Sequence, residues 1–262
     1  MASLKNSKKI VVKVGTSTLT YANGCVNIRR VEQLVKVLAD IKNSGRDIIF
    51  VTSGAISVGV GKLGLSERPT TVGGKQAAAA VGQCELMYMY DKIFSEYGHT
   101  TAQVLLTRDG VEDPVRKQNI INTLSEILKL GAVPIINEND TVSTDEIEFG
   151  DNDTLSAMVA VLAEADGLII LSDIDGLYDA NPVNNPDAKL ISSVNKINDD
   201  LLSIAGGSGS NRGTGGMITK LNAAKIAMSA SIPMVIMNGS DPLLLYDVVE
   251  GKSVGTIFSQ EA

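Results

Sequence analysis

Runs of β-branched and aliphatic residues alternate with segments of helical periodicity along the chain, and this alternation limits the possible folds more than any other feature. The first run spans 10–14, and residues 28–41 then place apolar side chains at helical spacing ahead of Gly45. Further strands are expected at 47–52, 101–106, 132–136, 167–171 and 233–237, and further helices at 74–97, 116–130, 154–163, 217–230 and 242–249. Strands of this kind, separated by helices, predict an α/β fold with a mostly parallel sheet covered on both faces.

The 262 residues are expected to form one domain with two lobes that meet near residue 165. The hydrophobic fraction of 44% is sufficient for a sizeable core, and no long Pro/Ser-rich linker divides the chain. Residues 179–200 contain two Asn-Pro pairs and are expected to form a surface excursion. The lobes are therefore expected at about 1–165 and 166–262.

Charge and composition exclude several classes of function. A formal net charge of −7 argues against general attraction to a nucleic-acid backbone, and the absence of Trp argues against stacking platforms for single strands. The two cysteines, Cys25 and Cys84, form no CxxC pair, so neither a disulfide framework nor a zinc ribbon is expected. No apolar run approaches the roughly 20 residues of a membrane span. We expect a cytoplasmic protein with no nucleic-acid or membrane partner that acts on a small molecule.

Ligands of parallel α/β sheets bind where the strands end, and two such turns near the N-terminus hold unusual residues. Lys13 lies within a buried-looking strand and is followed by Gly15. Either Lys13 lies at a sheet edge and reaches solvent, or its cation faces a phosphate held by backbone N–H groups. Ser53 and Gly54 lead from a strand directly into a helix, whose N-terminus is then open to an anion. Ser53 can also serve as the N-cap of that helix.

Two further turns carry polar or glycine-rich sequences. Asn137, Asp140, Asn152 and Asp153 form a polar cluster around a strand end and a helix start, larger than turn formation requires, although all are ordinary loop residues. Glycines in 206–216 lead into a helix that carries Lys220. This pattern favours a phosphate site over a flexible linker, because a linker does not normally continue into an amphipathic helix.

Some motifs are set aside. Residues 59–64 match GxGxxG, but residues 53–58 intervene where the dinucleotide fingerprint needs a tight turn after the strand. His99 is the only histidine, which argues against chemistry that needs two imidazoles.

Lysines, glycines and carboxylates with almost no histidine suit phosphoryl transfer from ATP to a carboxylate. Such an acceptor, with a pKa of roughly 4.3, is already deprotonated at neutral pH and needs no general base.

Six motifs, in this order, resemble the amino acid kinase family over essentially the whole chain: KVG at 13–15, VTSGAISVG at 51–59, INEND at 136–140, FGDND at 149–153, LSDIDGLY at 171–178 and GTGGMITK at 213–220. The INEND and FGDND pair resembles the members that phosphorylate the side-chain carboxylate of glutamate. The resemblance implies a three-layer α/β/α sandwich, with glutamate in the N-terminal lobe and ATP in the C-terminal lobe. An acetylglutamate kinase, a UMP kinase and a non-catalytic nucleotide-binding regulator remain alternatives.

The resemblance also implies roles for single residues. Lys13 and Lys220 would contact the phosphates, and Asp153 would orient both lysines. Glutamate would be held by Ser53, Gly54, Asn137, Asp140 and Asn152, with Asp140 as the partner of its ammonium group. The ATP site would comprise Lys13, Gly15, Ser172, Asp173, Thr214, Gly215, Gly216, Met217, Ile218, Thr219 and Lys220.

The family also suggests properties beyond single residues. Mg²⁺ would be held mainly by the nucleotide phosphates. A homo-oligomer, dimer or tetramer, and feedback inhibition by proline are expected. Many bacterial members carry a C-terminal RNA-binding-like module, and we expect this chain to act without one.

Overall fold

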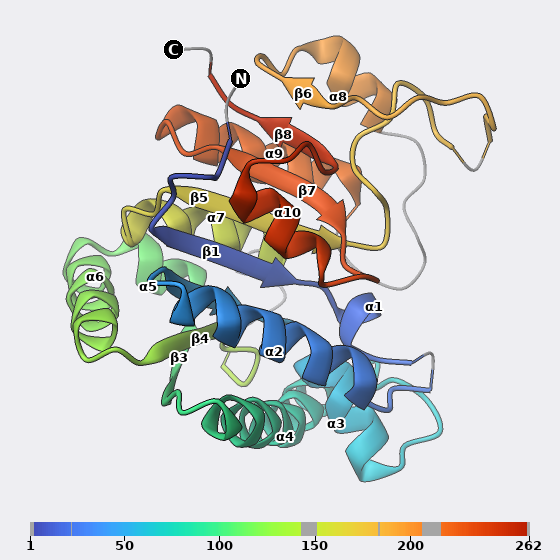
Figure 1. The fold of residues 1–262 in the computed structure, drawn as a ribbon. Helices are drawn as coiled ribbons and strands as arrows, with labels where there is room; N and C mark the ends of the chain where they lie inside the picture. The colour runs from blue at the N-terminus through green and yellow to red at the C-terminus, as the bar shows by residue number, and fades with distance from the viewer. Residues whose placement is uncertain (1–2, 22, 143–150, 183, 206–215, 261–262) are drawn as a thin grey trace.

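The computed structural model describes residues 3–21, 23–142, 151–182, 184–205 and 216–260. Within them the strands form one eight-stranded sheet in the order β3-β4-β2-β1-β5-β7-β8-β6 (Figure 1). All neighbouring strands are parallel except β7 and β8, which pair antiparallel. The strands are β1 (Lys9–Val14), β2 (Asp47–Val51), β3 (Thr101–Leu106), β4 (Val133–Glu138), β5 (Gly167–Ser172), β6 (Ser193–Val194), β7 (Met234–Asn238) and β8 (Thr256–Phe258).

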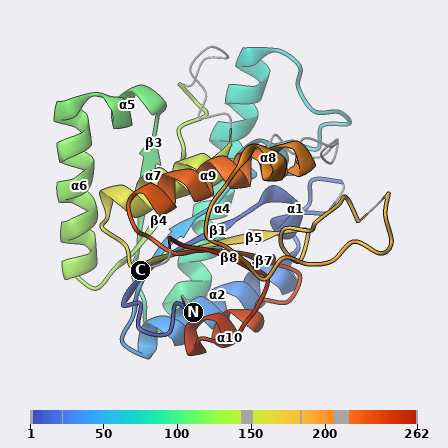
Figure 2. The ribbon, with the colours of Figure 1, turned by 90° about the horizontal axis from the view of Figure 1, so that it is seen from above.

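Helices cover both faces of this sheet. They are α1 (Thr16–Leu19), α2 (Ile28–Asn43), α3 (Ala55–Leu63), α4 (Val72–Glu96), α5 (Arg108–Glu112), α6 (Pro114–Lys129), α7 (Asn152–Leu162), α8 (Asp199–Ala205), α9 (Met217–Ser229) and α10 (Leu244–Glu250). Seen from above, α7 and α9 lie on one side of the sheet and α2 and α10 on the other (Figure 2). The α/β/α arrangement expected from the sequence is confirmed.

The core is divided in two by the sheet, because alternate residues of a strand face opposite sides. Val12 of β1 packs with α2, α4 and α10, whereas its neighbour Val11 packs with α7 and α9. Central strands are therefore buried on both faces, which explains their continuous apolar runs. β1 lies between β2 and β5, so the alternative that Lys13 lies at a sheet edge is wrong.

Short elements account for most differences from the sequence-based expectation. The elements that were not expected are α1, α5, α8, β6 and β8, which have two to seven residues each. They carry no apolar pattern distinct enough to separate them from the neighbouring loops. The segment 179–200, expected as a surface excursion, also contributes β6, which pairs with β8 at the end of the sheet. The structure therefore ties part of this segment to the sheet by backbone hydrogen bonds.

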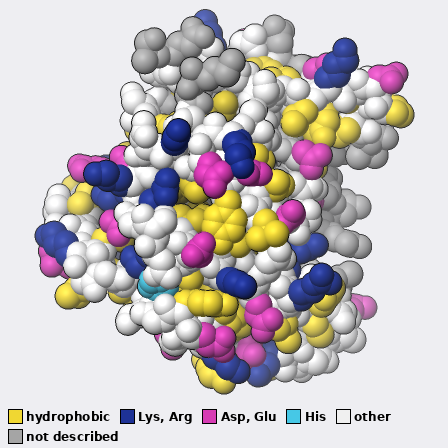
Figure 3. Space-filling model, in the orientation of Figure 1, with side chains coloured by type: hydrophobic (Ala, Val, Ile, Leu, Met, Phe, Trp, Pro, Cys, Tyr) yellow, Lys and Arg dark blue, Asp and Glu magenta, His cyan; other side chains and the backbone are white. Residues whose placement is uncertain are grey.

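The surface in Figure 3 shows basic and acidic side chains interspersed, without a broad area of one sign on that face. Among the described residues, no helix combines the length and the apolar character needed to cross a lipid bilayer.

Candidate active site

The ends of the central parallel strands bring the candidate residues to one edge of the sheet. Lys13 near the end of β1 lies beside Val51 of β2 and Ile170 of β5, so these three strands end at the same level. The turn after β2 leads into α3, and α7 packs against β1, β4 and β5. Segments distant in the sequence therefore meet beside Lys13.

A fully buried carboxylate joins two lysines at this edge. The Nζ atom of Lys13 lies 2.6 Å from Oδ1 of Asp153, and the Nζ atom of Lys220 lies 3.1 Å from Oδ2. The hydroxyl of Thr219 donates to Oδ2 at 2.9 Å. Asp153 is 0% exposed, and the two lysines are also buried. The structure thus brings Lys13, Lys220 and Asp153 together.

The charge state of Asp153 follows from two opposing effects. Burial disfavours the ionised carboxylate and by itself raises the pKa. The nearby charges of Lys13 and Lys220, with hydrogen bonds from Lys13 and Thr219, outweigh burial and lower the pKa of Asp153 to about 2. Asp153 is therefore ionised at neutral pH. Two ammonium groups facing one carboxylate leave net positive charge in the cluster for an anionic ligand.

Among the helices that begin at this edge, α3 and α9 have no described side chain capping their N-termini. Gly54 is the N-cap of α3 and Gly216 is the N-cap of α9, so the first N–H groups of both helices stay available for an anion. Gly54 has φ +91°, a left-handed conformation that glycine adopts without strain. Side chains cap four other helices: Asn27 caps α2, Thr71 caps α4, Asp113 caps α6 and Asp151 caps α7.

Ser53 has a different role from capping. Its hydroxyl donates to the carbonyl of Val14 at 2.8 Å and so ties the end of β2 to the end of β1. The alternative that Ser53 caps α3 is therefore wrong, and the cap position belongs to Gly54. Ser53 is only partly buried, so its hydroxyl oxygen can also accept a hydrogen bond from a ligand.

A chain of side-chain amides lies next to the lysine pair. Asn152 donates through Nδ2 to the carbonyl of Thr52 at 2.6 Å and to Oδ1 of Asn137 at 2.8 Å. Oδ1 of Asn137 also accepts the backbone N–H of Glu138 at 2.9 Å, and its Nδ2 donates to Oε1 of Gln83 at 2.9 Å. We call Gln83, Asn137 and Asn152 the amide relay. Asn152 and Asp153 are adjacent in α7, so the relay borders the lysine pair.

The remaining predicted residues occupy the same strand and helix ends. Asp140 lies two residues beyond β4 and is half-buried. Gly15 follows β1, and a Cβ at this position would lie 3.7 Å from Nζ of Lys13. Ser172 ends β5, is buried and donates through its hydroxyl to the exposed Asp173.

The glycine-rich motif is described only in part. Gly216, Met217, Ile218 and Thr219 form the start of α9 ahead of Lys220. Thr214 and Gly215, which were also predicted to contact ATP, lie outside the described residues.

Gln83 was missed by the sequence-based predictions. It lies on the buried stripe of α4 with Ala79, Leu86 and Tyr90, and it is 7% exposed. A polar side chain at an apolar position of a helical period is the signal that could have found it, because buried amides need partners.

A magnesium ion was also expected. Both oxygens of Asp153 face lysines, and the described residues contain no group of three or more His, Cys, Asp or Glu side chains placed to hold a metal ion. These residues suit a phosphate anion, and a metal that arrives with its own phosphate ligands fits such a site.

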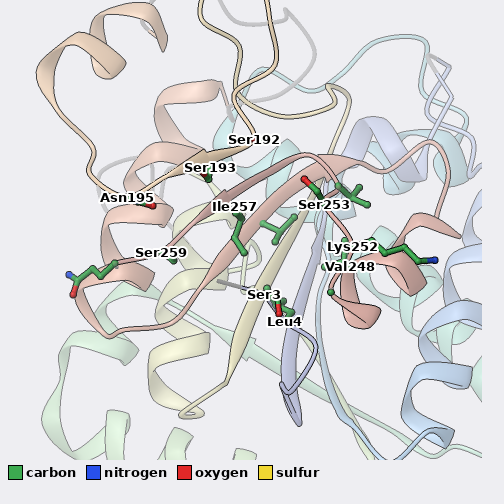
Figure 4. A pocket seen from close by; sticks show the side chains of 14 residues that line it. Ser3, Leu4, Ser192, Ser193, Asn195, Val248, Lys252, Ser253, Ile257 and Ser259 are labelled. Atoms are coloured by element: carbon green, nitrogen blue, oxygen red, sulfur yellow. The ribbon is translucent and has the colours of Figure 1, made fainter. Parts of the chain in front are cut away.

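A separate groove of about 860 Å³ is lined by residues of β6, β7, β8 and α10 (Figure 4). Its lining includes Leu4, Ser193, Val248 and Ile257 and none of the predicted site residues. Leu4 precedes β1, whereas Lys13 lies near the end of that strand. This groove is therefore separate from the candidate site.

The profile described as "Amino acid kinase family" matches residues 8–238. The chain is 55% identical to the glutamate 5-kinase of Clostridium perfringens over 260 residues, 98% of this chain and 97% of that protein. It is 57% identical to the glutamate 5-kinase of Clostridium tetani over 256 residues, covering 98% and 96%. It is 51% identical to the glutamate 5-kinase of Listeria innocua over 263 residues, covering 99% and 95%.

Solved structures share the fold at low sequence identity. The UMP kinase of Bacillus anthracis superposes with a TM-score of 0.66 at 16% identity, covering 98% of this chain and 97% of that chain. The isopentenyl phosphate kinase of T. acidophilum superposes with a TM-score of 0.65 at 19% identity, covering 95% and 99%.

Proposed function

The chain belongs to the amino acid kinase family, and we infer that it transfers the γ-phosphoryl group of ATP to the side-chain carboxylate of L-glutamate, the first step of proline biosynthesis. The product is γ-glutamyl phosphate. The main structural support for this chemistry is that Lys13 and Lys220 both contact the carboxylate of Asp153.

The two lysines address the main obstacle to this reaction, which is repulsion between two anions. The acceptor carboxylate is already a nucleophile at neutral pH, so no proton needs to be removed from it. The ammonium groups of Lys13 and Lys220 neutralise charge on the transferring phosphoryl group, and Asp153 holds both in place. Because all three side chains are buried, this charge is less screened than on the surface.

The acceptor binds in the lobe of residues 1–165, where β2 and β4 end and α7 begins. The N–H groups at the start of α3, behind Gly54, and the hydroxyl of Ser53 suit a carboxylate of glutamate. Asn137 and Asn152 belong to the amide relay at the same edge. Asp140 is the carboxylate that we assign to the ammonium group of glutamate.

The nucleotide binds mainly to the lobe of residues 166–262, around the end of β5 and the start of α9. Lys13, Gly15 and Lys220 face the phosphates, and the open N-terminus of α9 supplies N–H donors. Ser172, Asp173 and residues 214–219 complete this side. Mg²⁺, held mainly by the nucleotide phosphates, would neutralise charge on the transferring group.

Three further properties belong to the proposal. Exposed apolar side chains on and between α3 and α4, namely Leu63, Leu65, Val72 and Tyr88, support a homo-oligomer, dimer or tetramer, in which another copy covers them. Proline shares an α-carboxylate and an adjacent ammonium group with glutamate, which supports its action as a feedback inhibitor at or near the acceptor site. Use of ATP supports a cytoplasmic location.

A coupled assay of ADP release tests the proposed function. The purified chain is given ATP and Mg²⁺ with glutamate, aspartate, N-acetylglutamate or UMP. We expect turnover with glutamate above that with the other three acceptors. Turnover with another acceptor and none with glutamate would overturn the proposal. Proline titration in the same assay tests inhibition, and analytical ultracentrifugation tests the oligomeric state.

A further inference from the structure

We propose that Gln83 is a positioning residue for acceptor specificity, through which the amide relay presents Oδ1 of Asn152 to the α-ammonium group of the acceptor. This inference rests on the proposed function, because it assumes that the acceptor is an amino acid. It adds a residue of α4 to a site otherwise built from strand ends and the starts of α3, α7 and α9.

The orientation of the relay is set by the backbone. An amide side chain can present either its oxygen or its nitrogen, and a neighbouring group of known polarity decides between them. The N–H of Glu138 can only donate, so the atom of Asn137 that faces it is Oδ1. The carbonyl of Thr52 can only accept, so the atom of Asn152 that faces it is Nδ2.

This orientation determines which atom of Asn152 remains for a ligand. Its two amide hydrogens are used by the carbonyl of Thr52 and by Oδ1 of Asn137. Oδ1 of Asn152, an acceptor, is the polar atom that the relay does not use. At neutral pH both carboxylates of glutamate can only accept, and the α-ammonium is its one donor group. A contact between Oδ1 of Asn152 and glutamate must therefore involve the ammonium.

Gln83 closes the buried end of the relay. Its Oε1 accepts a hydrogen bond from Nδ2 of Asn137 at 2.9 Å. Asn137 is 1% exposed, so without this acceptor its amide donor would be buried and unpaired. Nε2 of Gln83 is itself buried with no hydrogen-bond partner among the described residues. An aliphatic residue at position 83 would avoid burying the unpaired Nε2 group. The presence of glutamine there, despite this cost, indicates that its acceptor oxygen is needed by Asn137.

Two glycines place Gln83 at this end. A Cβ on Gly82 would lie 1.8 Å from the carbonyl oxygen of Ala55, and a Cβ on Gly59 would lie 1.8 Å from the carbonyl oxygen of Ala78. The backbones of α3 and α4 therefore touch directly, which only glycine permits. Gly59 is the first glycine of the GxGxxG match, so that motif serves helix packing. Because Ala55 begins α3 at the acceptor site, this contact fixes Gln83 relative to the site.

Steady-state kinetics of three variants test the proposal. Gln83→Leu removes the acceptor oxygen at similar volume, and we expect the KM for glutamate to rise about tenfold, with the KM for ATP within about twofold of wild type. Leu86→Ala is the matched control, because Leu86 is fully buried one turn further along α4 and outside the relay. It should lower the melting temperature without changing the KM for glutamate. Gln83→Glu retains an acceptor oxygen and should recover most of the loss.

Glutarate, which is glutamate without the ammonium group, separates a role in ammonium binding from a purely structural role. A purely structural role of Gln83 would leave the relative affinity for glutarate and glutamate unchanged. We expect the ratio of the inhibition constant of glutarate to the KM for glutamate to fall in Gln83→Leu and to stay unchanged in Leu86→Ala. The proposal is overturned if Gln83→Leu leaves the glutamate KM within about twofold, if Leu86→Ala raises it equally, or if Gln83→Glu is as impaired as Gln83→Leu. Turnover of the wild-type chain with glutamate is measured in the same experiment. Absence of that turnover would contradict the proposed function itself, whereas the outcomes above concern only the role of Gln83.

Discussion

The ammonium groups of Lys13 and Lys220 contact different oxygen atoms of one carboxylate, that of Asp153, at 2.6 and 3.1 Å. Lys13 comes from the central strand β1 and Lys220 from the first turns of α9, so two segments far apart in the sequence meet in this contact. A buried charge that loses its partner is strongly unfavourable, so the three side chains hold one another in position. The arrangement keeps two cations close together in advance of a polyanionic ligand.

Replacement of Lys220 by alanine should lower kcat by about 10³-fold, because it removes a cation that stabilises the transferring phosphoryl group. Lys225→Ala is the matched control, since Lys225 is exposed on the same helix. Steady-state kinetics with glutamate and ATP provide the measurement. An effect confined to KM would show that Lys220 contributes to binding and not to the transition state.

Asp153→Asn should destabilise the fold by about 3–5 kcal/mol, because Lys13 and Lys220 keep their buried charges and lose the opposite one. Urea unfolding at neutral pH measures this change. Asp187→Asn replaces an exposed carboxylate and should leave the free energy of unfolding nearly unchanged. Equal effects of the two substitutions would contradict a special role for the buried cluster.

Wild-type stability should fall as the pH is lowered from about 4 to about 2, in part because Asp153 becomes protonated. Its pKa of about 2 in the folded chain lies below the ordinary value of 3.8. Ionised Asp153 therefore stabilises the folded state. This stabilisation is complete at pH values above the pKa of the unfolded chain and is lost as the pH falls through the pKa of the folded chain. Urea unfolding across this range should show a shallower decline for Asp153→Asn. The same decline in both proteins would assign the acid sensitivity to other carboxylates.

Asp140→Ala should raise the KM for glutamate with little change in the KM for ATP, because we assign Asp140 to the substrate ammonium and not to the phosphates. Asp140→Asn tests the charge separately, since it keeps the size of the side chain. An unchanged KM for glutamate in both variants would remove Asp140 from the acceptor site.

Gly82→Ala should destabilise the chain and raise the KM for glutamate, because the added methyl group would overlap the carbonyl of Ala55 and push α4 away from α3. Gly73→Ala is the matched control within α4, since a Cβ there meets nothing within 4 Å. Its replacement should raise the melting temperature slightly, as alanine favours a helix over glycine by about 1 kcal/mol. Thermal unfolding of both variants provides the comparison.

The amino-acid sequence by itself determined the layers of this protein and most of the residues at its strand ends. Apolar periodicity is a local property, so the strand that carries Lys13 and the helix that carries Lys220 could be predicted within a few residues. The rule that ligands bind where parallel strands end then placed Ser53 and Asn137 at one edge. The α/β/α arrangement followed from the same alternation.

Only the tertiary structure decided how those residues face one another. The direction of the Ser53 hydroxyl toward Val14, and the cap at Gly54 in place of Ser53, depend on how β2 lies beside β1. Gln83 reaches Asn137 because two glycines let α3 and α4 touch, and no local pattern encodes that contact. Hydrogen-bond partners are set by packing between distant segments, whereas strands and helices are set mainly by neighbours in the chain.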